Sequence, residues 1–371
     1  MDFELDELQK MVCATAARFV GEIDSFHARR TADTGYPARI RAAMAEMGWT
    51  GIAAAEEHGG FGGRAEDLVL LMQETGFSSA APMLLGNVIL PTLLLRASDM
   101  PAARSALSHL IDGTLRFGFA GYEAEQGYGL DRPRTMARRD GADWCLVGAK
   151  HLAFGGGRPD QLLVTVQIDH SGQTGLFLID AADAGVAIRE HVLIDGMFAC
   201  DITFDGHVVD DAALVLQGQV ADAAVSAAVD LAALCQCAAI VGCMDRATRL
   251  TADYLKVREQ FRKPLAEFQV LQHRVSDMFI ATNDARSMLY AALAATDGTP
   301  DLRARAISAC KVKVMDAAGV VTGEAVHLHG GIGFTKEYEV GALYQRAVVM
   351  KRLLGDREYH LARVASLAAG N

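Results

Sequence analysis

A glycine-rich segment and an upstream arginine could together hold a phosphate-bearing ligand. Gly330, Gly331 and Gly333 have no side chains, so their backbone N–H groups can approach a phosphate closely. Arg258 could supply the cation that pairs with a pyrophosphate. A Gly-Gly-x-Gly stretch by itself is also a common way to end a helix, so the prediction depends on both features occurring together.

These features resemble the flavin-binding signature of the acyl-CoA dehydrogenase family. The resemblance includes the aromatic and amide residues near them, and it holds for both their order and their spacing. The match covers most of the chain and is strongest over residues 254–278 and 325–346. The resemblance implies FAD as the cofactor. It assigns the cofactor contacts to Arg258, Phe261, Phe268, Gln269, His327, Gly330, Gly331 and Gly333.

The family's reaction says which further residues should be present. Its members oxidise an acyl-CoA thioester to the 2,3-enoyl thioester: FAD accepts the β-hydride, and a carboxylate removes the α-proton. Because that proton is only weakly acidic, the base must sit beside it in a water-poor pocket where hydrogen bonds polarise the carbonyl. The resemblance therefore implies an acyl-CoA substrate, an electron-transfer partner and a role in lipid or steroid metabolism.

No carboxylate occupies the positions where the family places this base. On the first long helix of the C-terminal part they fall at Ala232 and Ala239, which share one helix face because seven residues rotate an α-helix by about 700°. In the C-terminal turn, where the family has E-G-T, the position is Leu354. The residues flanking the helix positions are Cys235, Gln236 and Cys243. The catalytic residue is therefore unknown.

Asp230 matches the aspartate of the family's D-x-x-R segment, which the resemblance places near the CoA moiety. The arginine of that segment is replaced by Ala233. Asp230 and Ala239 are about 180° apart around the helix, so Asp230 is poorly placed to replace the base. Two interpretations stay open: a substrate contact, or a polar residue at the edge of a helical bundle.

The segments that face the flavin ring in the family are also altered. Residues 122–127 stand where the family has T-E-P-x-A-G-S-D, and residues 150–154 stand where it has K-x-W-I-T-N. The resemblance implies that a stacking tryptophan and a hydroxyl near the flavin are lost. The glycine after R-x-Q-F is replaced by Arg262, and we expect His151 to be a surface or turn histidine.

These losses follow the way the family shares its cofactor between subunits. One chain's β-domain holds the flavin ring, and the neighbouring chain supplies the arginine, the glutamine and the glycines. This chain keeps the residues that contribute to the neighbour's cofactor, whereas it lacks the family's residues in its own flavin-ring pocket.

The tail at residues 354–356 resembles that of the small subunits of pimeloyl-CoA-type and actinobacterial steroid-degrading dehydrogenases.

Our leading hypothesis is an acyl-CoA dehydrogenase-like flavoprotein that dehydrogenates a CoA thioester within an oligomer, as a tetramer that is a dimer of dimers. The first alternative is a catalytically silent subunit of a heterotetramer with a paralogous chain. A second is an altered flavin or CoA-thioester reaction that needs no carboxylate base. A third is a structural or binding module without a cofactor.

Composition argues against several other classes of protein. A net charge of −11 without a basic stripe is not typical of a nucleic-acid-binding protein. The apolar run at residues 223–241 is interrupted by polar residues and predicts a buried helix, not a membrane span.

The N-terminus lacks a secretory pattern, so we expect a cytoplasmic protein. Seven cysteines without C-x-x-C pairs indicate reduced, packed thiols and no metal site.

The elements that must position these residues are predicted as helices, then strands, then helices. Apolar residues recur every three to four positions over residues 5–23, and helical runs follow at 38–47 and 66–76. Short β-like segments begin near residue 117, with Asp140-Gly141 and Asp205-Gly206 as turns, and alanine-rich helices follow from about residue 220.

We predict the acyl-CoA dehydrogenase fold, mostly α. Its parts are an N-terminal helical domain (1–115), a β-barrel-like middle domain (116–216) and a C-terminal four-helix bundle (217–371).

Overall fold

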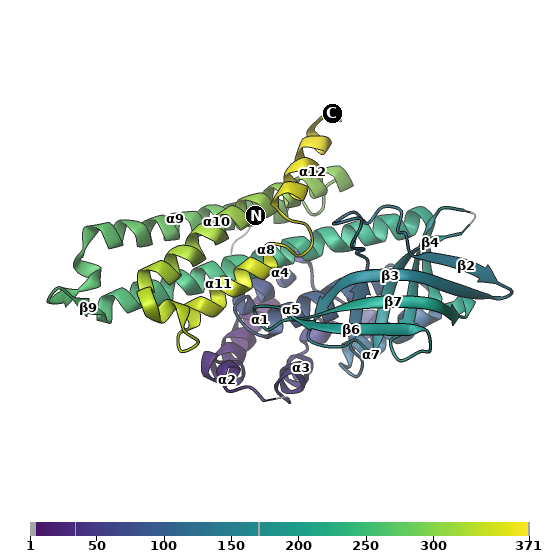
Figure 1. Ribbon diagram of the computed structural model, residues 1–371, viewed down its shortest axis with the longest axis horizontal. Coiled ribbons are helices and arrows are strands. Elements are labelled where there is room, and N and C mark those ends of the chain that lie inside the picture. Colours follow the sequence, from purple (N-terminus) through teal and green to yellow (C-terminus); the bar gives the residue numbers. More distant parts are fainter. Residues whose placement is uncertain (1–4, 34, 170, 370–371) are drawn as a thin grey trace. The chain divides into compact units, whose positions relative to one another are not determined.

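The chain forms two compact units, each made of segments that are separate in the sequence (Figure 1). The computed structural model describes residues 5–33, 35–169 and 171–369. Of these residues, unit 1 comprises 5–32, 65–81 and 233–369, and unit 2 comprises 33, 35–64, 82–169 and 171–232. The order of helices, strands and helices confirms the predicted fold class. The compact units divide the chain differently from the three predicted domains, whose boundaries stay a proposal.

Unit 1 is built from helices. Those wholly inside it are α1 (Glu7–Arg18), α2 (Phe26–Arg30), α4 (Ala65–Thr75), α9 (Gln269–Ala294), α10 (Pro300–His329), α11 (Glu339–Met350) and α12 (Arg357–Ala369), with the short strands β9 (Glu259–Gln260) and β10 (Lys263–Pro264). The sequence explains where α10 begins, because the Thr299 hydroxyl accepts from the Leu302 amide and Pro300 takes the first helical position. Helices α9 and α10 lie side by side (Figure 1).

The longest helix, α8 (Gly218–Val257), begins in unit 2 and ends in unit 1. Among the described residues it is the one helix long and apolar enough to cross a membrane. However, 72% of its most apolar 18-residue window is buried inside the protein. Such burial is typical of a core helix, which is what the interrupted apolar run predicts.

Two glycines bring α8 into backbone contact with α4 and the turn that follows it. A Cβ added at Gly76 would lie 2.1 Å from the carbonyl oxygen of Ala239, and one added at Gly242 would lie 2.0 Å from that of Gln73. Only glycine permits approaches this close. The backbone of α8 at Ala239 is therefore covered by Gly76.

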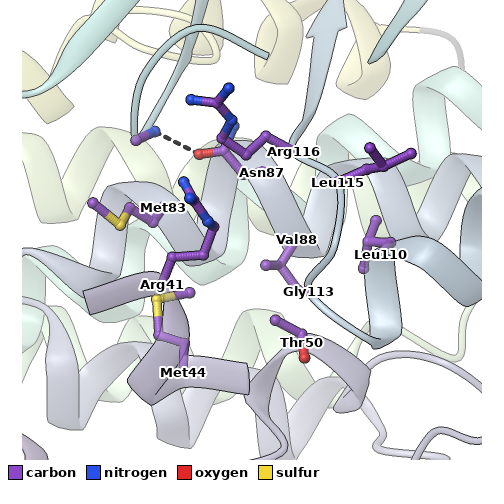
Figure 2. A pocket seen from close by; sticks show the side chains of 11 residues that line it. Arg41, Met44, Thr50, Met83, Asn87, Val88, Leu110, Gly113, Leu115 and Arg116 are labelled. Carbon is purple, nitrogen blue, oxygen red and sulfur yellow. Dashed lines mark hydrogen bonds between the residues drawn. The ribbon is translucent and has the colours of Figure 1, made fainter. Parts of the chain in front are cut away.

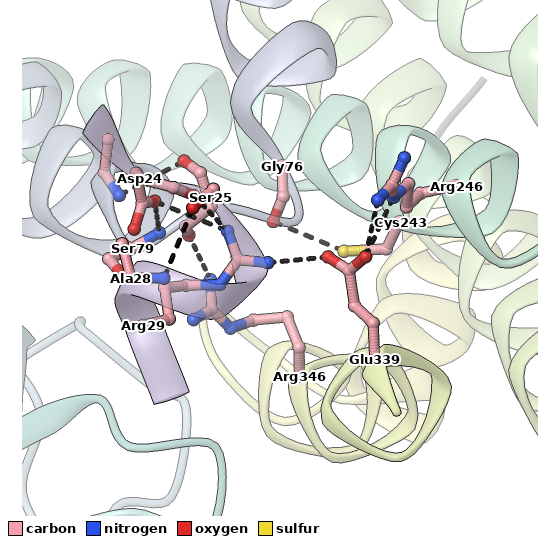
Figure 3. Close-up of polar contacts among 12 residues, drawn as sticks. Asp24, Ser25, Ala28, Arg29, Gly76, Ser79, Cys243, Arg246, Glu339 and Arg346 are labelled. Carbon is pink, nitrogen blue, oxygen red and sulfur yellow. Dashed lines mark hydrogen bonds and ion pairs between the residues drawn. The ribbon is translucent and has the colours of Figure 1, made fainter. Parts of the chain in front are cut away.

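A buried carboxylate joins the N-terminal and C-terminal helices of unit 1 (Figure 3). Glu339, at the start of α11, is 4% exposed and accepts from Arg29 at 2.6 Å and from Arg246 of α8 at 2.7 Å. Arg29 also lies 3.7 Å from the carboxylate of Asp24. Two cations therefore face two carboxylates, which is the pairing that makes buried charge tolerable.

Unit 2 combines short helices with one β-sheet. Its helical segments are α3 (Tyr36–Glu46), the π-helix η4 (Leu84–Ile89), α6 (Leu90–Leu95) and α7 (Pro101–Ile111), and α5 (Ala80–Met83) crosses from unit 1. Its strands are β1 (Phe117–Ala120), β2 (Met136–Asp140), β3 (Asp143–Gly155), β4 (Gln161–Ile168), β5 (Thr174–Asp180), β6 (Val186–Val192), β7 (Phe198–Val209) and β8 (Leu214–Gln217). The sheet order is β6-β7-β3-β2-β4-β5-β8, with β1 parallel to β4. Trp144, Phe177 and Phe204 lie in its buried core.

One of the two predicted turns is wrong. Asp140-Gly141 does connect β2 to β3, but Asp205-Gly206 lies inside β7. The register between β3 and β7 shifts at this point, and Gly206 has φ +67°. A glycine in the left-handed region marks a β-bulge here instead of a strand end.

Candidate functional site

The structure brings the predicted cofactor contacts of unit 1 to one end of its helices. Arg258 directly follows α8, Gln269 begins α9 and Gly330 follows α10. The Tyr254 hydroxyl, one turn before Arg258, donates to the His329 carbonyl at 3.3 Å, and the two rings stack with centroids 4.4 Å apart. The ends of α8 and α10 are therefore in contact.

Six of the eight predicted contacts face solvent. The exposed members are Arg258, Phe261, Gln269, His327, Gly330 and Gly331. Phe261 is 84% exposed. The Arg258 guanidinium has no hydrogen-bond or ion-pair partner among the described residues. An exposed large aromatic beside an exposed cation is typical of a surface that contacts another molecule.

The three glycines of the motif have three different roles. Gly330 ends α10 with φ 63° and ψ −141°, a conformation that residues with a side chain rarely adopt. A Cβ at Gly333 would lie 2.7 Å from the Val326 carbonyl oxygen, so this glycine is needed for packing. At Gly331 a Cβ would meet nothing within 4 Å. Gly331 therefore leaves space above the backbone that no described atom fills.

The hairpin after Arg258 holds two large residues in the left-handed region. Phe261 has φ 54° and Arg262 has φ 65°, and they form the two-residue loop between Gln260 and Lys263. A two-residue hairpin loop with both φ values positive is the type I′ turn, which favours asparagine and glycine. The glycine-to-arginine replacement noted in the sequence therefore adds backbone strain at this exposed tip.

The two remaining predicted contacts are held by neighbouring side chains. Arg274 donates to Nδ1 of His327 at 2.8 Å. The Phe268 ring packs edge-on against Phe261 with centroids 6.0 Å apart, and the Lys263 ammonium lies 4.2 Å from its centroid. Phe268 therefore contacts both Phe261 and Lys263 of the hairpin.

All three family base positions are buried and apolar. Ala232 and Ala239 are 0% exposed and Leu354 is 3% exposed. Leu354 has φ 57°, and its carbonyl accepts from Nε2 of His360 at 2.9 Å. These positions form tightly packed structure and supply no proton acceptor.

Gln236 lies between the two helix positions on the same face of α8, four residues after Ala232 and three before Ala239. It is 0% exposed, and neither its amide nitrogen nor its amide oxygen has a hydrogen-bond partner among the described residues. Buried amides without partners are uncommon in native proteins. The sequence places Gln236 on this face by its spacing, but only the packing shows that its amide is unpaired.

In unit 2, the segments that face the ring in the family form a buried ion pair. The Lys150 ammonium donates to Glu123 at 2.6 Å, and the Thr135 hydroxyl donates to the same carboxylate at 2.8 Å. Burial lowers the pKa of Lys150 to about 8, although Glu123 opposes this shift. The pair anchors the end of β3 to the segment after β1.

His151 is half-exposed, as predicted, but it has a specific partner. Its Nδ1 lies 2.6 Å from Asp201, which also accepts from His191 at 2.8 Å and from Arg189 at 2.9 Å. Burial opposes the ionisation of Asp201, yet the hydrogen bonds from Arg189 and His191 hold its pKa well below the usual range. The next residue, Leu152, has φ 56° at a bulge in β3. The sequence contained no signal for this cluster, because its members come from three strands.

Asp230 lies on α8 and is 2% exposed. It is therefore buried, and the interpretation as a polar residue at the edge of the helical bundle stays open. Its contact with substrate stays a proposal.

The residues of unit 1 fit the pyrophosphate end of a flavin dinucleotide. An exposed guanidinium at Arg258 and the open backbone at Gly331 suit an anionic ligand. The ring segments fit less well, since positions 152–154 offer neither an aromatic ring at the tryptophan position nor a hydroxyl. The residues suited to the pyrophosphate therefore lie in one part of the chain, and the altered flavin-ring segments lie in another.

The architecture and the retained residues define a class: helical proteins with an inserted β-sheet that use a flavin with CoA thioesters. Residues 6–114 match the family profile of the acyl-CoA dehydrogenase N-terminal domain, and residues 222–368 match that of the acyl-CoA dehydrogenase C-terminal domain. Together these matches span more than half of the chain. The chain belongs to the acyl-CoA dehydrogenase family, which confirms the resemblance seen in the sequence.

Relatives in this family differ in the reactions that their names describe. The chain is 27% identical to acryloyl-CoA reductase (NADH) of Anaerotignum propionicum, over 98% of this chain and 95% of the relative. It is 29% identical to 3-sulfinopropanoyl-CoA desulfinase of Paraburkholderia xenovorans, over 99% and 97%. A solved variant of the Tcur3481-Tcur3483 steroid ACAD is 27% identical with a TM-score of 0.83, over 98% and 97%.

Proposed function

We propose that this chain is a flavoprotein subunit that acts on CoA thioesters within an oligomer and completes the FAD site of a neighbouring subunit. The observation that supports this is the set of exposed, outward-facing residues at the end of α8 and α10. Arg258 would pair with the pyrophosphate, and Gly330 and Gly331 would admit its close approach. When bound, FAD supplies a hydride acceptor for α,β-dehydrogenation of the thioester.

The proposal also includes a cytoplasmic location for the protein, a partner protein that accepts its electrons, and a contact between Asp230 and the CoA part of the substrate.

The second candidate is a catalytically silent subunit of a heterotetramer with a paralogous chain. It is favoured by the buried, apolar state of Ala232, Ala239 and Leu354, because a thioester α-proton needs a positioned base. The similarity to a desulfinase favours a third candidate, a reaction on a CoA thioester that needs no such base.

The test of the cofactor role is the FAD-to-protein ratio of the purified oligomer, alone and co-expressed with a paralogous subunit. Arg258→Ala should lower FAD retention, because a charge-assisted contact contributes about 1.5–3 kcal/mol. Gly331→Val should lower it as well by filling the open space. Gly330→Val is a poor choice because φ 63° would strain any side chain there. Arg305→Ala, at an exposed arginine of α10, is the matched control. Unchanged flavin content in both test variants, with unchanged melting temperature, would refute the proposed role.

The test of catalysis is turnover of acyl-CoA thioesters with an artificial electron acceptor. We expect the chain alone to be slower than a family member with its carboxylate by about 10²–10⁴, the usual effect of losing a general base. Rapid dehydrogenation by the isolated chain would eliminate the silent-subunit candidate. Activity that appears only with the paralogous subunit would support it.

A further inference from the structure

A small pocket in unit 2, separate from every residue assigned to the flavin, contains two arginines (Figure 2). Arg41 reaches it from α3 and Arg116 from the segment before β1. Apolar side chains form most of the remaining wall. They are Met44, Met83, Val88, Leu110 and Leu115. A cation pair among apolar walls is an unusual arrangement for residues that only face solvent.

The charges in this pocket are not balanced. Arg116 donates to Asp160 from Nε at 2.9 Å and from Nη2 at 2.7 Å, which neutralises one arginine and leaves its Nη1 unused by that carboxylate. Arg41 makes no hydrogen bond to a described residue, although Asp160 acts on it at longer range. Burial, and then the nearby charge of Arg116, lower the pKa of Arg41. One positive charge therefore remains without a close counter-ion.

The other polar groups at the pocket are already satisfied. Asn87, on the π-helix η4, donates to the Phe117 carbonyl and accepts from the Gly156 amide. The Thr50 hydroxyl donates to the Ile111 carbonyl at 2.7 Å. Figure 2 shows the Arg41 side chain extending from α3 toward Asn87 and Arg116. The unused hydrogen-bond donors of the pocket are therefore on its two guanidinium groups.

We propose that Arg41 and Arg116 form a binding site for a small carboxylate anion, held by the free fork of Arg41 and by Nη1 of Arg116. A guanidinium matches a carboxylate because both are planar and offer two parallel hydrogen bonds. The free space inside the pocket is about 20 Å³, which is room for a group the size of a carboxylate and excludes a nucleotide. Asn87 and Gly156 link this site to the end of β3, so an occupant would stabilise that segment as well.

The experiment measures the melting temperature of the purified full chain at constant ionic strength, with potassium fluoride replaced stepwise by acetate or chloride. Acetate should raise the melting temperature in a saturable way by about 2–4 °C. Arg41→Gln should abolish the acetate response. Arg39→Gln should keep it, because Arg39 is an exposed arginine of the same helix that pairs with Asp33.

Each arm of the experiment decides the proposal. Because the response to acetate is read within each variant, a change in the basal stability of Arg41→Gln does not affect the comparison. Slower hydrogen exchange at the Gly156 amide in acetate, absent in Arg41→Gln, would add support from within the pocket. A full response in Arg41→Gln, or no response in the unmodified chain, would overturn the site. An equal response to chloride would overturn its assignment to a carboxylate.

Discussion

At the scale of single residues, Gln236 carries hydrogen-bonding capacity that the fold does not use. Its buried amide has no partner among the described residues, and such a group costs about 1–3 kcal/mol. We therefore expect Gln236→Leu to raise the free energy of unfolding by about 1–2 kcal/mol and to remove stabilisation by a bound acyl-CoA. Urea unfolding and melting curves with and without butyryl-CoA would measure both effects.

Thr248→Val on the same helix is the matched control for Gln236→Leu, since the Thr248 hydroxyl is also buried without a partner. It should leave the response to butyryl-CoA intact. If Gln236→Leu lowers stability instead, the amide has a partner in the ligand-free protein, and the expected contact of this amide with a bound acyl-CoA loses its basis.

Lys311 predicts an unusual dependence of stability on pH. It is fully buried in α10 and donates to the Leu353 carbonyl, and burial lowers its pKa to about 7. In the unfolded chain the pKa is about 10.4, so between pH 7 and pH 10 the unfolded state binds more protons and the free energy of unfolding rises with pH. Below pH 7 the folded state carries the full penalty of a buried charge.

The expected outcome is a stability difference between Lys311→Met and the unmodified chain that changes by about 4 kcal/mol from pH 7 to pH 10. The variant should be relatively more stable at pH 7 and should lose that advantage by pH 10. Lys313→Met, at a half-exposed lysine of the same helix that pairs with Asp284, should show no such change. Urea unfolding across the pH range measures all three proteins, and a difference independent of pH would contradict the prediction.

At the scale of elements, the β9–β10 hairpin keeps a strained turn. We expect Arg262→Gly to stabilise the fold by about 1 kcal/mol, because glycine adopts φ 65° without steric penalty. Arg262→Ala should give no gain, since alanine keeps the strain. Thermal unfolding compares the variants. Equal stability of the glycine and alanine variants would mean that the turn relaxes in solution.

At the scale of the whole molecule, unit 1 exposes large apolar side chains on its long helices. On α9 the exposed fractions are 64% for Val270, 62% for Phe279 and 56% for Ile280, and on α10 that of Val320 is 56%. An oligomer that covers these residues would account for their exposure. Phe279→Ser should weaken assembly by about 2 kcal/mol, roughly thirtyfold in the association constant.

Light scattering across a dilution series would measure this change in assembly. Val192→Ser, at an exposed valine of β6 in unit 2, is the control and should leave the oligomer unchanged. An oligomer that is unaffected by Phe279→Ser would place the subunit interface elsewhere.

The order of elements and the family follow from the sequence alone. Helical periodicity over residues 66–76 predicted α4, and the interrupted apolar run predicted the buried α8. These features follow from short-range geometry, which a sequence displays directly. The spacing of Arg258 and Gly330 likewise identified the candidate cofactor residues.

What each of these residues contacts depends on how the chain packs in three dimensions. Gly206 sits in a bulge because β7 must stay in register with β3, which lies far from it in the sequence. Gln236 is unpaired because of what packs on α8, and Arg41 approaches Arg116 because α3 packs near the start of β1. Partners of this kind are set by long-range packing, and local residue patterns do not encode them.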